Sequence, residues 1–289
     1  MQPIYNTEGR IMYLRAMQLA SLEGSGVTSV SKIGVIHSSS DDGASIKAGI
    51  EEQRNINLAT DPNQPTVTYA QMNSTVATEL TAQVQAVKDC DVVIIAGNQT
   101  YFQAAYNAMQ TANVRKPVIT SYVNIAPATV PDEAVDANAS DIYGGAWVII
   151  DDSADERQKA DFTRFVGICT WGVEKGIISQ SIADSYMISA YAMSSFIALE
   201  VFMEGINRLA DKEITREAFL EAMESAPINV PISGGVNYAN GQRIGLDGMS
   251  FVKYVRPTEA GAAASTGTFV NVIGMQSIDQ ILGELDDAE

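Results

Sequence analysis

Short apolar runs alternate with helical patterns through the first half of the chain. Alternation of this kind predicts a parallel sheet, because a helix carries the chain from one parallel strand to the next in a right-handed crossover. The predicted strands are Lys32–His37, Thr66–Ala70, Asp91–Ala96, Pro117–Thr120 and Ile142–Ile150. The predicted helices are Thr7–Leu22, Ala44–Asn55, Thr75–Lys88 and a segment that ends near Ala112. The fold class is therefore α/β, with a parallel sheet flanked by helices.

The pattern changes after the fifth predicted strand. The polar run Asp151–Glu156 predicts a crossing between domains. Helical spacing then continues, and the predicted helices are Ala154–Glu174, Ser181–Arg208 and Thr215–Ser225. Further on, Asn240-Gly241 is typical of a hairpin turn between Val236–Tyr238 and Met249–Val255. A last strand is expected at Phe269–Gly274, followed by a frayed acidic end.

The predicted strands of the first half end in loops of small and polar residues. These loops are Ser38–Gly43, Gly97–Tyr101 and Thr120–Asn124. In a parallel α/β sheet such loops line one crevice at the carboxyl ends of the strands, where ligands bind. The first loop lacks the lysine and the glycine spacing of a phosphate-binding loop. His37, the single histidine, has no positioned triad partners in the pattern. We therefore expect a binding protein without catalytic residues, cofactor or metal ion.

Composition narrows the class of partner. The net charge of −17 disfavours a nucleic-acid partner, because phosphate binding needs clustered Lys and Arg. The two cysteines, Cys90 and Cys169, do not make a disulfide framework, and a bridge between them stays open. No segment has the length and apolar composition of a membrane span. Residues Met1–Ala20 lack the apolar core of a signal peptide.

Several motifs match one family in order and spacing. They are Gln2–Arg10, Lys32–His37 with Asp42-Gly43, Asp91–Gly97, Lys116–Ile119, Tyr143–Trp147, Ser185–Gly205, and Ile232–Tyr238 with Asn240-Gly241. As a set they resemble the branched-chain amino-acid (Leu/Ile/Val) substrate-binding proteins of ABC transporters, which have the type I periplasmic-binding fold. The resemblance covers Gln2 to about Val255, and it implies two lobes that close on a ligand.

The resemblance also implies an incomplete fold, because the N-terminal half-lobe of the family has no match. Residues 1–150 would form most of ligand-binding lobe two. Residues 151–247 would be the helical C-terminal part of lobe one, and residues 248–289 would return to lobe two. We expect the apolar faces of Ser181–Arg208 and Thr215–Ser225 to lack a partner layer, and the isolated chain to associate, to dissolve poorly or to be loose there.

The resemblance carries five candidate ligand-binding residues: Asp42, Gln99, Thr100, Tyr122 and Tyr186. Asp42, where the family often has an aromatic residue, would face a ligand amine; the alternative is that Asp41 or Asp42 caps the next helix. Gln99 and Thr100 would line the crevice, or else form an ordinary turn with a Thr100 cap. Tyr122 stands where classical members have a carboxylate for the ligand ammonium, so it would stack on the ligand or simply pack. Tyr186 would edge the pocket or belong to the core.

The implied function is that of a non-enzymatic solute-binding component of an ABC importer. It would bind a small polar, amino-acid-like ligand between two lobes and present it to a membrane permease, and the full-length protein would be periplasmic or on the cell surface. One alternative is a ligand-sensing regulator or receptor ectodomain of the same fold. A truncated chain without ligand activity is another. An α/β enzyme is disfavoured, because no nucleophile–base pair is visible.

Overall fold

The computed structural model describes residues 3–148, 156–187, 189–210, 212–242 and 245–287. The chain divides into two compact units. Unit 1 consists of Met1–Ile4, Trp147–Ser250 and Gly274–Gln276, and unit 2 of Tyr5–Ala146, Phe251–Ile273 and Ser277–Glu289. The last predicted residues of the fifth strand, Ile149 and Ile150, and most of the predicted crossing lie outside the described residues.

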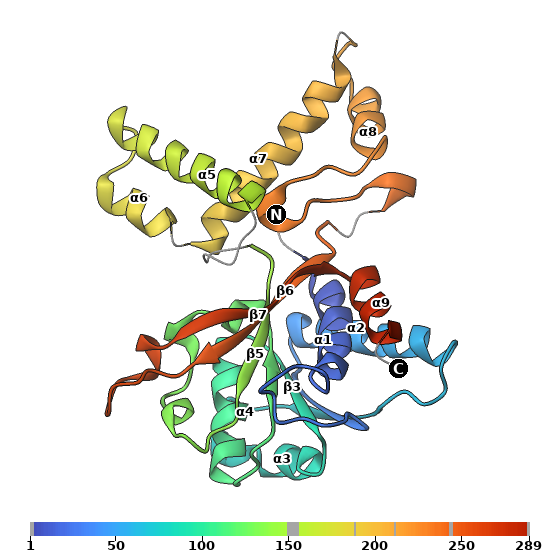
Figure 1. Ribbon diagram of the computed structural model, residues 1–289, viewed down its shortest axis with the longest axis vertical. Coiled ribbons are helices and arrows are strands. Elements are labelled where there is room, and N and C mark those ends of the chain that lie inside the picture. Colours follow the sequence, from blue (N-terminus) through green and yellow to red (C-terminus); the bar gives the residue numbers. More distant parts are fainter. Residues whose placement is uncertain (1–2, 149–155, 188, 211, 243–244, 288–289) are drawn as a thin grey trace. The chain divides into compact units, whose positions relative to one another are not determined.

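A seven-stranded sheet in the order β2-β1-β3-β4-β5-β6-β7 lies mostly in unit 2 (Figure 1). Its strands are β1 Lys32–Ser38, β2 Thr66–Met72, β3 Val92–Ala96, β4 Val118–Thr120, β5 Ile142–Ala146, β6 Gly248–Val255 and β7 Thr268–Ser277. The first five pair in parallel, for example Ile33 with Val92 and Val93 with Val118. The prediction of a parallel sheet is therefore confirmed. Strands β3, β4 and β5 are buried along their whole length, as continuous apolar runs predict for a sheet covered on both faces.

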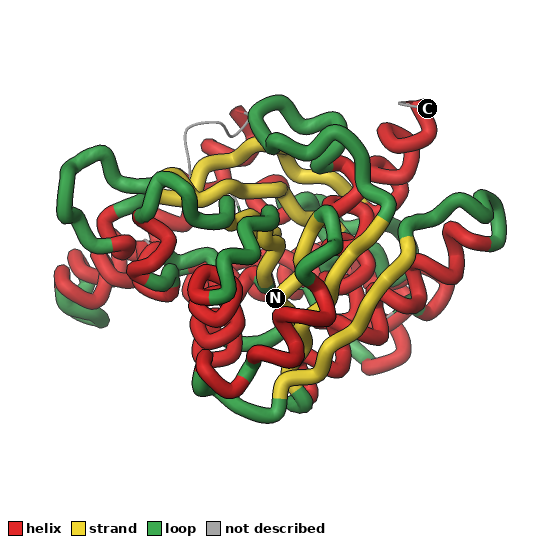
Figure 2. The backbone as a smooth tube through the Cα atoms, turned by 90° about the horizontal axis from the view of Figure 1, so that it is seen from below, coloured by secondary structure: helices red, strands yellow, loops and turns green. Residues whose placement is uncertain are grey.

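Helices cover the sheet of unit 2, and Figure 2 shows its strands with helices on both sides. The helices are α1 Tyr5–Gln18, α2 Asp41–Leu58, α3 Thr81–Val87, α4 Gln99–Thr111 and α9 Ile278–Asp287. Helices α3 and α4 share one apolar cluster with the sheet. Its members include Ile36, Val93, Ile95, Val84, Phe102 and Met109. The short 3-10 helices of the chain are η1 Ala77–Glu79, η2 Tyr122–Asn124, η3 Pro127–Thr129, η4 Asp132–Val135, η5 Pro231–Ser233, η6 Ala239–Gly241 and η7 Ala264–Thr266.

Two glycines allow α1 and α2 to pack backbone against backbone. A Cβ atom at Gly9 would lie 2.1 Å from the carbonyl oxygen of Ile46, and one at Gly49 would lie 2.0 Å from the carbonyl oxygen of Asn6. Any side chain at either position would force the helices apart. This close crossing fixes α1 against the sheet and so determines where its side chains reach.

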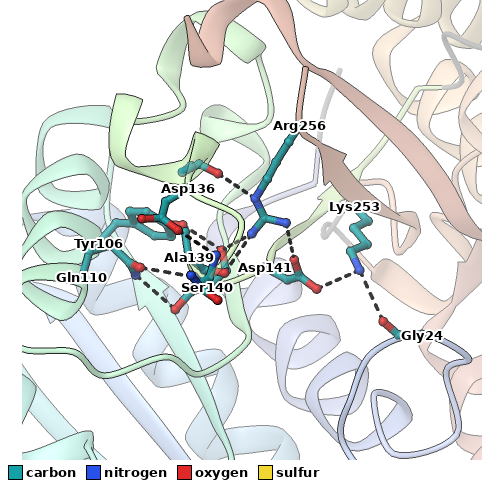
Figure 3. Close-up of polar contacts among 11 residues, drawn as sticks. Gly24, Tyr106, Gln110, Asp136, Ala139, Ser140, Asp141, Lys253 and Arg256 are labelled. Atoms are coloured by element: carbon teal, nitrogen blue, oxygen red, sulfur yellow. Dashed lines mark hydrogen bonds and ion pairs between the residues drawn. The ribbon is translucent and has the colours of Figure 1, made fainter. Parts of the chain in front are cut away.

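The chain returns to the sheet of unit 2 after residue 250. The ring of Phe251 stacks on Tyr143 of β5, with centroids 5.3 Å apart. Arg256, which follows β6, donates to Asp141, which precedes β5, over 3.0 Å. Figure 3 shows Asp141 between Arg256 and Lys253. The end of β6 thus lies beside the start of β5, and β6 runs antiparallel to it.

The acidic C-terminal end is a helix and not the frayed tail that its composition predicts. Helix α9 buries Ile278 and Ile281. Its Glu284 carboxylate accepts a hydrogen bond of 3.0 Å from the Gln18 amide of α1. An amphipathic pattern with a partner helix thus outweighs the charge of the end.

Unit 1 is mostly helical in its described part. Its helices are α5 Glu156–Glu174, α6 Gln180–Met187, α7 Ala190–Leu209 and α8 Arg216–Glu224. The prediction of one helix over Ser181–Arg208 is wrong. The Ser189 hydroxyl accepts a hydrogen bond from the Ala192 N–H, so a new helix begins there, at 83° to α6. Among the described residues no single helix is long and apolar enough to cross a membrane; only the bent pair α6–α7 reaches that length and composition.

The hairpin predicted at Asn240-Gly241 is also wrong. Both residues have the positive φ values that favoured the prediction, 58° and 75°, but they close the 3-10 turn η6. The antiparallel bridge nearby joins Val236 to Ile228, before the turn. Cys90 and Cys169 are both free and buried, so the disulfide left open by the sequence is absent.

Candidate functional site

Three loops follow β1, β3 and β4 of unit 2, at the edge where these parallel strands end. We call them the first loop (residues 38–43), the second loop (97–101) and the third loop (120–124). The Asn124 amide donates to the Gly97 carbonyl over 2.8 Å and to the Thr120 hydroxyl over 2.8 Å. A Cβ on Gly97 would lie 3.4 Å from the Ser38 Cβ. The loops are therefore in direct contact, and the prediction that they converge on one edge is confirmed.

The first loop presents a small hydroxyl–carboxylate group. Ser38 is fully buried, and its hydroxyl lies 2.7 Å from that of Ser40. The Ser40 hydroxyl in turn donates to the Asp42 carboxylate. Ser40 occupies the N-cap position of α2, so neither Asp41 nor Asp42 is the cap that the sequence offered as an alternative. Both carboxylates stand in the first helical turn, where negative charge is stabilised by the helix dipole.

The second loop exposes its polar side chains. Gln99 and Thr100 are both exposed at the start of α4. The Gln99 amide donates to the Val123 carbonyl of the third loop over 2.9 Å. The Thr100 hydroxyl donates to the Asn98 side chain over 3.0 Å, and the N-cap position belongs to Asn98 and not to Thr100. Both side chains lie at the surface, where water competes for these bonds, and their ligand role stays a prediction.

The third loop buries its aromatic residue. Tyr122 is 3% exposed, and its ring stacks on Tyr5 of α1 with centroids 5.6 Å apart and planes 7° apart. One face of the ring is therefore covered by the protein itself. Of the two roles considered for Tyr122, packing has the stronger geometry, and a ligand contact stays a prediction.

Glu8 of α1 is the residue of this edge that sequence reasoning missed. It is 1% exposed, and both of its carboxyl oxygens are used. One accepts the backbone N–H of Tyr122 over 2.6 Å, and the other accepts the hydroxyl of Ser121 over 3.0 Å. A signal was present in the sequence: Glu8 lies one turn before Ile11 and two before Arg15, on the stripe that α1 buries. A carboxylate on a buried stripe is rarely without a specific partner.

The environment of Glu8 disfavours its charge. Burial raises the pKa of Glu8 to about 8, and the negative charge of Asp42 adds to this, while the hydrogen bonds from Tyr122 and Ser121 act against it. At neutral pH the carboxyl is therefore mostly protonated. This edge of the sheet thus has the buried, protonated carboxyl group of Glu8 and the half-buried carboxylate of Asp42.

His37, the last residue but one of β1, lies beside this site and is held by a backbone and a ring contact. Its Nδ1 is 3.0 Å from the backbone oxygen of Ser38, and its ring meets the edge of Tyr69. Burial lowers the pKa of His37, so the ring is neutral at pH 7. A neutral imidazole tied to a backbone carbonyl acts as a structural residue here.

Tyr186 belongs to unit 1, on α6, and is 45% exposed. It lines an apolar cavity of about 630 Å³ in that unit. The other lining residues are Phe165, Ile168, Cys169, Trp171, Gly172, Ile177, Ile178, Ser189, Tyr191, Ala192, Ser195, Phe196 and Leu199. The sequence predicted either a pocket edge or a core position for Tyr186. The structure places it on a half-exposed apolar face, and its ligand role stays a prediction.

Comparison with known proteins shows the fold. No protein-family model matches the chain, and no curated protein matches it. Among solved structures, a fatty acid ABC transporter substrate-binding protein from Thermomonospora curvata aligns with a TM-score of 0.60 and 13% identity, over 96% of this chain and 65% of that one.

Two further structures align in the same way. A leucine-, isoleucine-, valine-, threonine- and alanine-binding protein from Brucella ovis aligns with a TM-score of 0.61 and 13% identity, over 93% of this chain and 62% of that one. A branched chain amino acid ABC transporter protein from Thermus thermophilus with bound valine aligns with a TM-score of 0.58 and 13% identity, over 98% of this chain and 68% of that one. The chain thus has the fold of type I periplasmic binding proteins and spans about 65% of the length of such chains.

Proposed function

We propose that this chain belongs to a solute-binding protein that takes up a small polar, amino-acid-like ligand at the joined loops of unit 2. The full-length protein would work outside the cytoplasmic membrane and deliver its ligand to the permease of an ABC importer. The observation that carries the proposal is the convergence of three polar loops at the carboxyl ends of parallel strands, held together by Asn124 and Gln99.

The chemistry of these loops suits recognition of a polar ligand. Ser40, Gln99 and Thr100 offer hydroxyl and amide groups, and half-buried Asp42 offers an acceptor for an ammonium group. The Ser40 hydroxyl donates to Asp42, but these four residues include no serine–histidine pair of the kind that activates a nucleophile. The role that fits is binding by directed hydrogen bonds, without a covalent step.

The solved neighbours support a solute-binding role and differ in their ligands. The Thermus thermophilus structure holds valine, whereas the Thermomonospora curvata protein is described as a fatty acid binder. The polar loops favour the first class, because a carboxylate such as Asp42 can pair with the ammonium of an amino acid and finds no counterpart on a fatty acid.

Thermal unfolding and calorimetry with defined compounds test the proposal. L-valine, L-leucine and L-isoleucine are compared with octanoate, which has a carboxylate and an alkyl chain but no ammonium. A ligand at 100 times its dissociation constant stabilises the folded state by about 2.7 kcal/mol. We expect a saturable rise in Tm with at least one amino acid and none with octanoate. A rise with octanoate alone, or with no compound, contradicts the amino-acid assignment.

A further inference from the structure

We propose that Glu8 is the positioning residue of the candidate ligand site: from α1, outside the three loops, it holds the third loop in the conformation that the other two loops use. The inference rests on the proposed function only in assigning ligand binding to this edge. The geometry of Glu8 itself can be tested without a ligand.

The first step is the double attachment of Glu8. One carboxyl oxygen accepts the Tyr122 N–H at 2.6 Å and the other the Ser121 hydroxyl at 3.0 Å. The Ser121 hydroxyl also lies at the start of η2, where it accepts a bond from the Val123 N–H. A single side chain thus fixes both the backbone and the capping residue of the third loop.

The second step is the contact one turn earlier on α1. Tyr5 and Glu8 are three residues apart and therefore lie on the same face of the helix. Tyr5 stacks on the ring of Tyr122 while Glu8 binds its backbone. Helix α1 therefore holds Tyr122 at two points. The Gly9 and Gly49 crossing keeps α1 itself close against α2.

The third step leads from the third loop to the rest of the site. The Val123 carbonyl accepts the Gln99 amide, and the Asn124 amide reaches the Gly97 carbonyl. These are the bonds that join the third loop to the second. If the Ser121–Tyr122 backbone moves, both bonds lose their geometry, and Gln99 loses its present orientation. Glu8 therefore acts on the site through the loop, without lying at its surface.

The charges around Glu8 give this role a measurable signature. Asp42 at the start of α2 is the charged group that acts on Glu8 among the described residues. Ser121 and Tyr122 face it from the third loop. Arg10 of α1 and Glu52 of α2 pair with each other at 3.8 Å on the exposed side of the same helix pair. Ionisation of Glu8 places a second negative charge near Asp42 and changes the bond that the Tyr122 N–H donates.

Nuclear magnetic resonance of the full chain tests the signature. The variants are Glu8→Gln, which keeps two hydrogen-bonding atoms but cannot ionise, and Glu8→Ala, which removes both bonds. Glu52→Gln is the matched control, since it neutralises an exposed carboxylate that also bonds α1, through Asn6. In the wild type we expect the amide shift of Tyr122 to titrate with a midpoint near pH 8. The titration should persist in the control Glu52→Gln and vanish in Glu8→Gln.

Hydrogen exchange of the third loop shows whether the hydrogen bonds of Glu8 hold this loop in place. We expect amide exchange in residues 121–124 to become at least about tenfold faster in Glu8→Ala and to change less than about threefold in Glu8→Gln, which rescues the bonds. Wild-type exchange rates in Glu8→Ala, or an unchanged Tyr122 titration in Glu8→Gln, overturn the proposal.

Calorimetry with L-valine connects the loop to binding. We expect Glu8→Ala to weaken the affinity at least about tenfold, with Glu8→Gln and Glu52→Gln within about threefold of the wild type. If the wild type binds L-valine and Glu8→Ala binds equally well, the positioning role is wrong. If the wild type binds no amino acid while the amide titration behaves as expected, the proposed function fails and the loop-holding role of Glu8 stands.

Discussion

The carboxyl group of Glu8 lies 2.6 Å from the backbone nitrogen of Tyr122, although 114 residues separate the two in the chain. This bond joins the first helix to the loop after the fourth strand. It sits in a fully buried position, where an unpaired group would cost about 1–3 kcal/mol.

The stability of unit 2 should depend on the ionisation of Glu8. Its pKa is near 4.5 in an unfolded chain and about 8 in the folded protein, so the folded state binds the proton more tightly. The stabilisation is complete below pH 4.5 and is lost as pH rises to 8, with a slope of at most about 1.4 kcal/mol per pH unit. Urea unfolding of wild type and Glu8→Gln from pH 5 to 9 measures the difference. A pH-independent difference between the two proteins would contradict the assigned burial.

Arg256 should stabilise the return of the chain to unit 2. Its guanidinium donates to the Ala134 carbonyl over 2.8 Å. It also donates to the Ala139 carbonyl over 2.8 Å and to Asp141 over 3.0 Å (Figure 3). Arg256→Ala leaves two carbonyls without this donor, and we expect a loss of about 2 kcal/mol in the free energy of unfolding. Arg256→Lys should recover less than half of it, because an ammonium cannot reproduce the planar fork. Exposed Lys88→Ala should stay within about 0.5 kcal/mol of the wild type.

The crossing of α1 and α2 should not tolerate a methyl group. A Cβ at Gly9 would meet the Ile46 carbonyl oxygen at 2.1 Å, so Gly9→Ala should destabilise unit 2 by at least about 2 kcal/mol. Gly283 of α9 is the matched control, because a Cβ there meets nothing within 4 Å. Gly283→Ala should be neutral or stabilise by about 0.5–1 kcal/mol, as expected for a helix interior. Equal effects in thermal unfolding would show that the close approach is not as described.

The candidate ligand residues can be ranked by exposure. Asp42→Ala and Gln99→Ala remove groups at the surface of the joined loops, and we expect each to weaken L-valine binding about tenfold in calorimetry, while Tm of the free protein changes little. Tyr122→Ala removes a buried ring that stacks on Tyr5, so it should lower Tm as well as affinity. Unchanged affinity in all three variants would remove these residues from the site.

The apolar face of α5, α6 and α7 should make the chain associate. Several large side chains of these helices and of the α5–α6 loop are exposed: Ile168 48%, Trp171 52%, Ile177 64% (in the loop), Tyr191 59% and Leu199 49%. Burying one such side chain contributes about 1.5–3 kcal/mol, so self-association is favourable despite the charge of the chain. We expect light scattering to show species above 30.9 kDa that Trp171→Glu and Ile177→Glu reduce. Val76→Glu in unit 2, at a residue 51% exposed, is the control and should have no effect.

A uniformly monodisperse wild type at high concentration would contradict this expectation. Some apolar side chains of these helices do find partners within unit 1. Phe196, in the predicted helix Ser181–Arg208, is 4% exposed and contacts both the ring of Phe165 and the guanidinium of Arg164. Phe202 and Phe219 pack on each other with centroids 5.6 Å apart, although Phe202 stays half-exposed.

The amino-acid sequence by itself determined the parallel sheet of unit 2 and the edge at which its loops meet. The reason is physical: short apolar runs such as Asp91–Ala96, bounded by turn residues, favour buried strands, and helices between them favour right-handed parallel crossovers. The polar residues that end each strand then fall on one edge, whatever the packing details. Local patterns of this kind survive without knowledge of distant contacts.

Only the tertiary structure decided which side chains complete that edge. The local sequence indicates only that Glu8 is an acidic residue in a helix. Its contacts with Ser121 and Tyr122 form because α1 packs against the sheet. The same holds for α9, which its acidic composition predicts to fray and which Gln18 and buried Ile281 hold in place. At Ser189 a cap ends one apolar helical pattern and starts another. Each of these outcomes depends on contacts between segments far apart in the chain, or on a single hydrogen bond that periodicity cannot reveal.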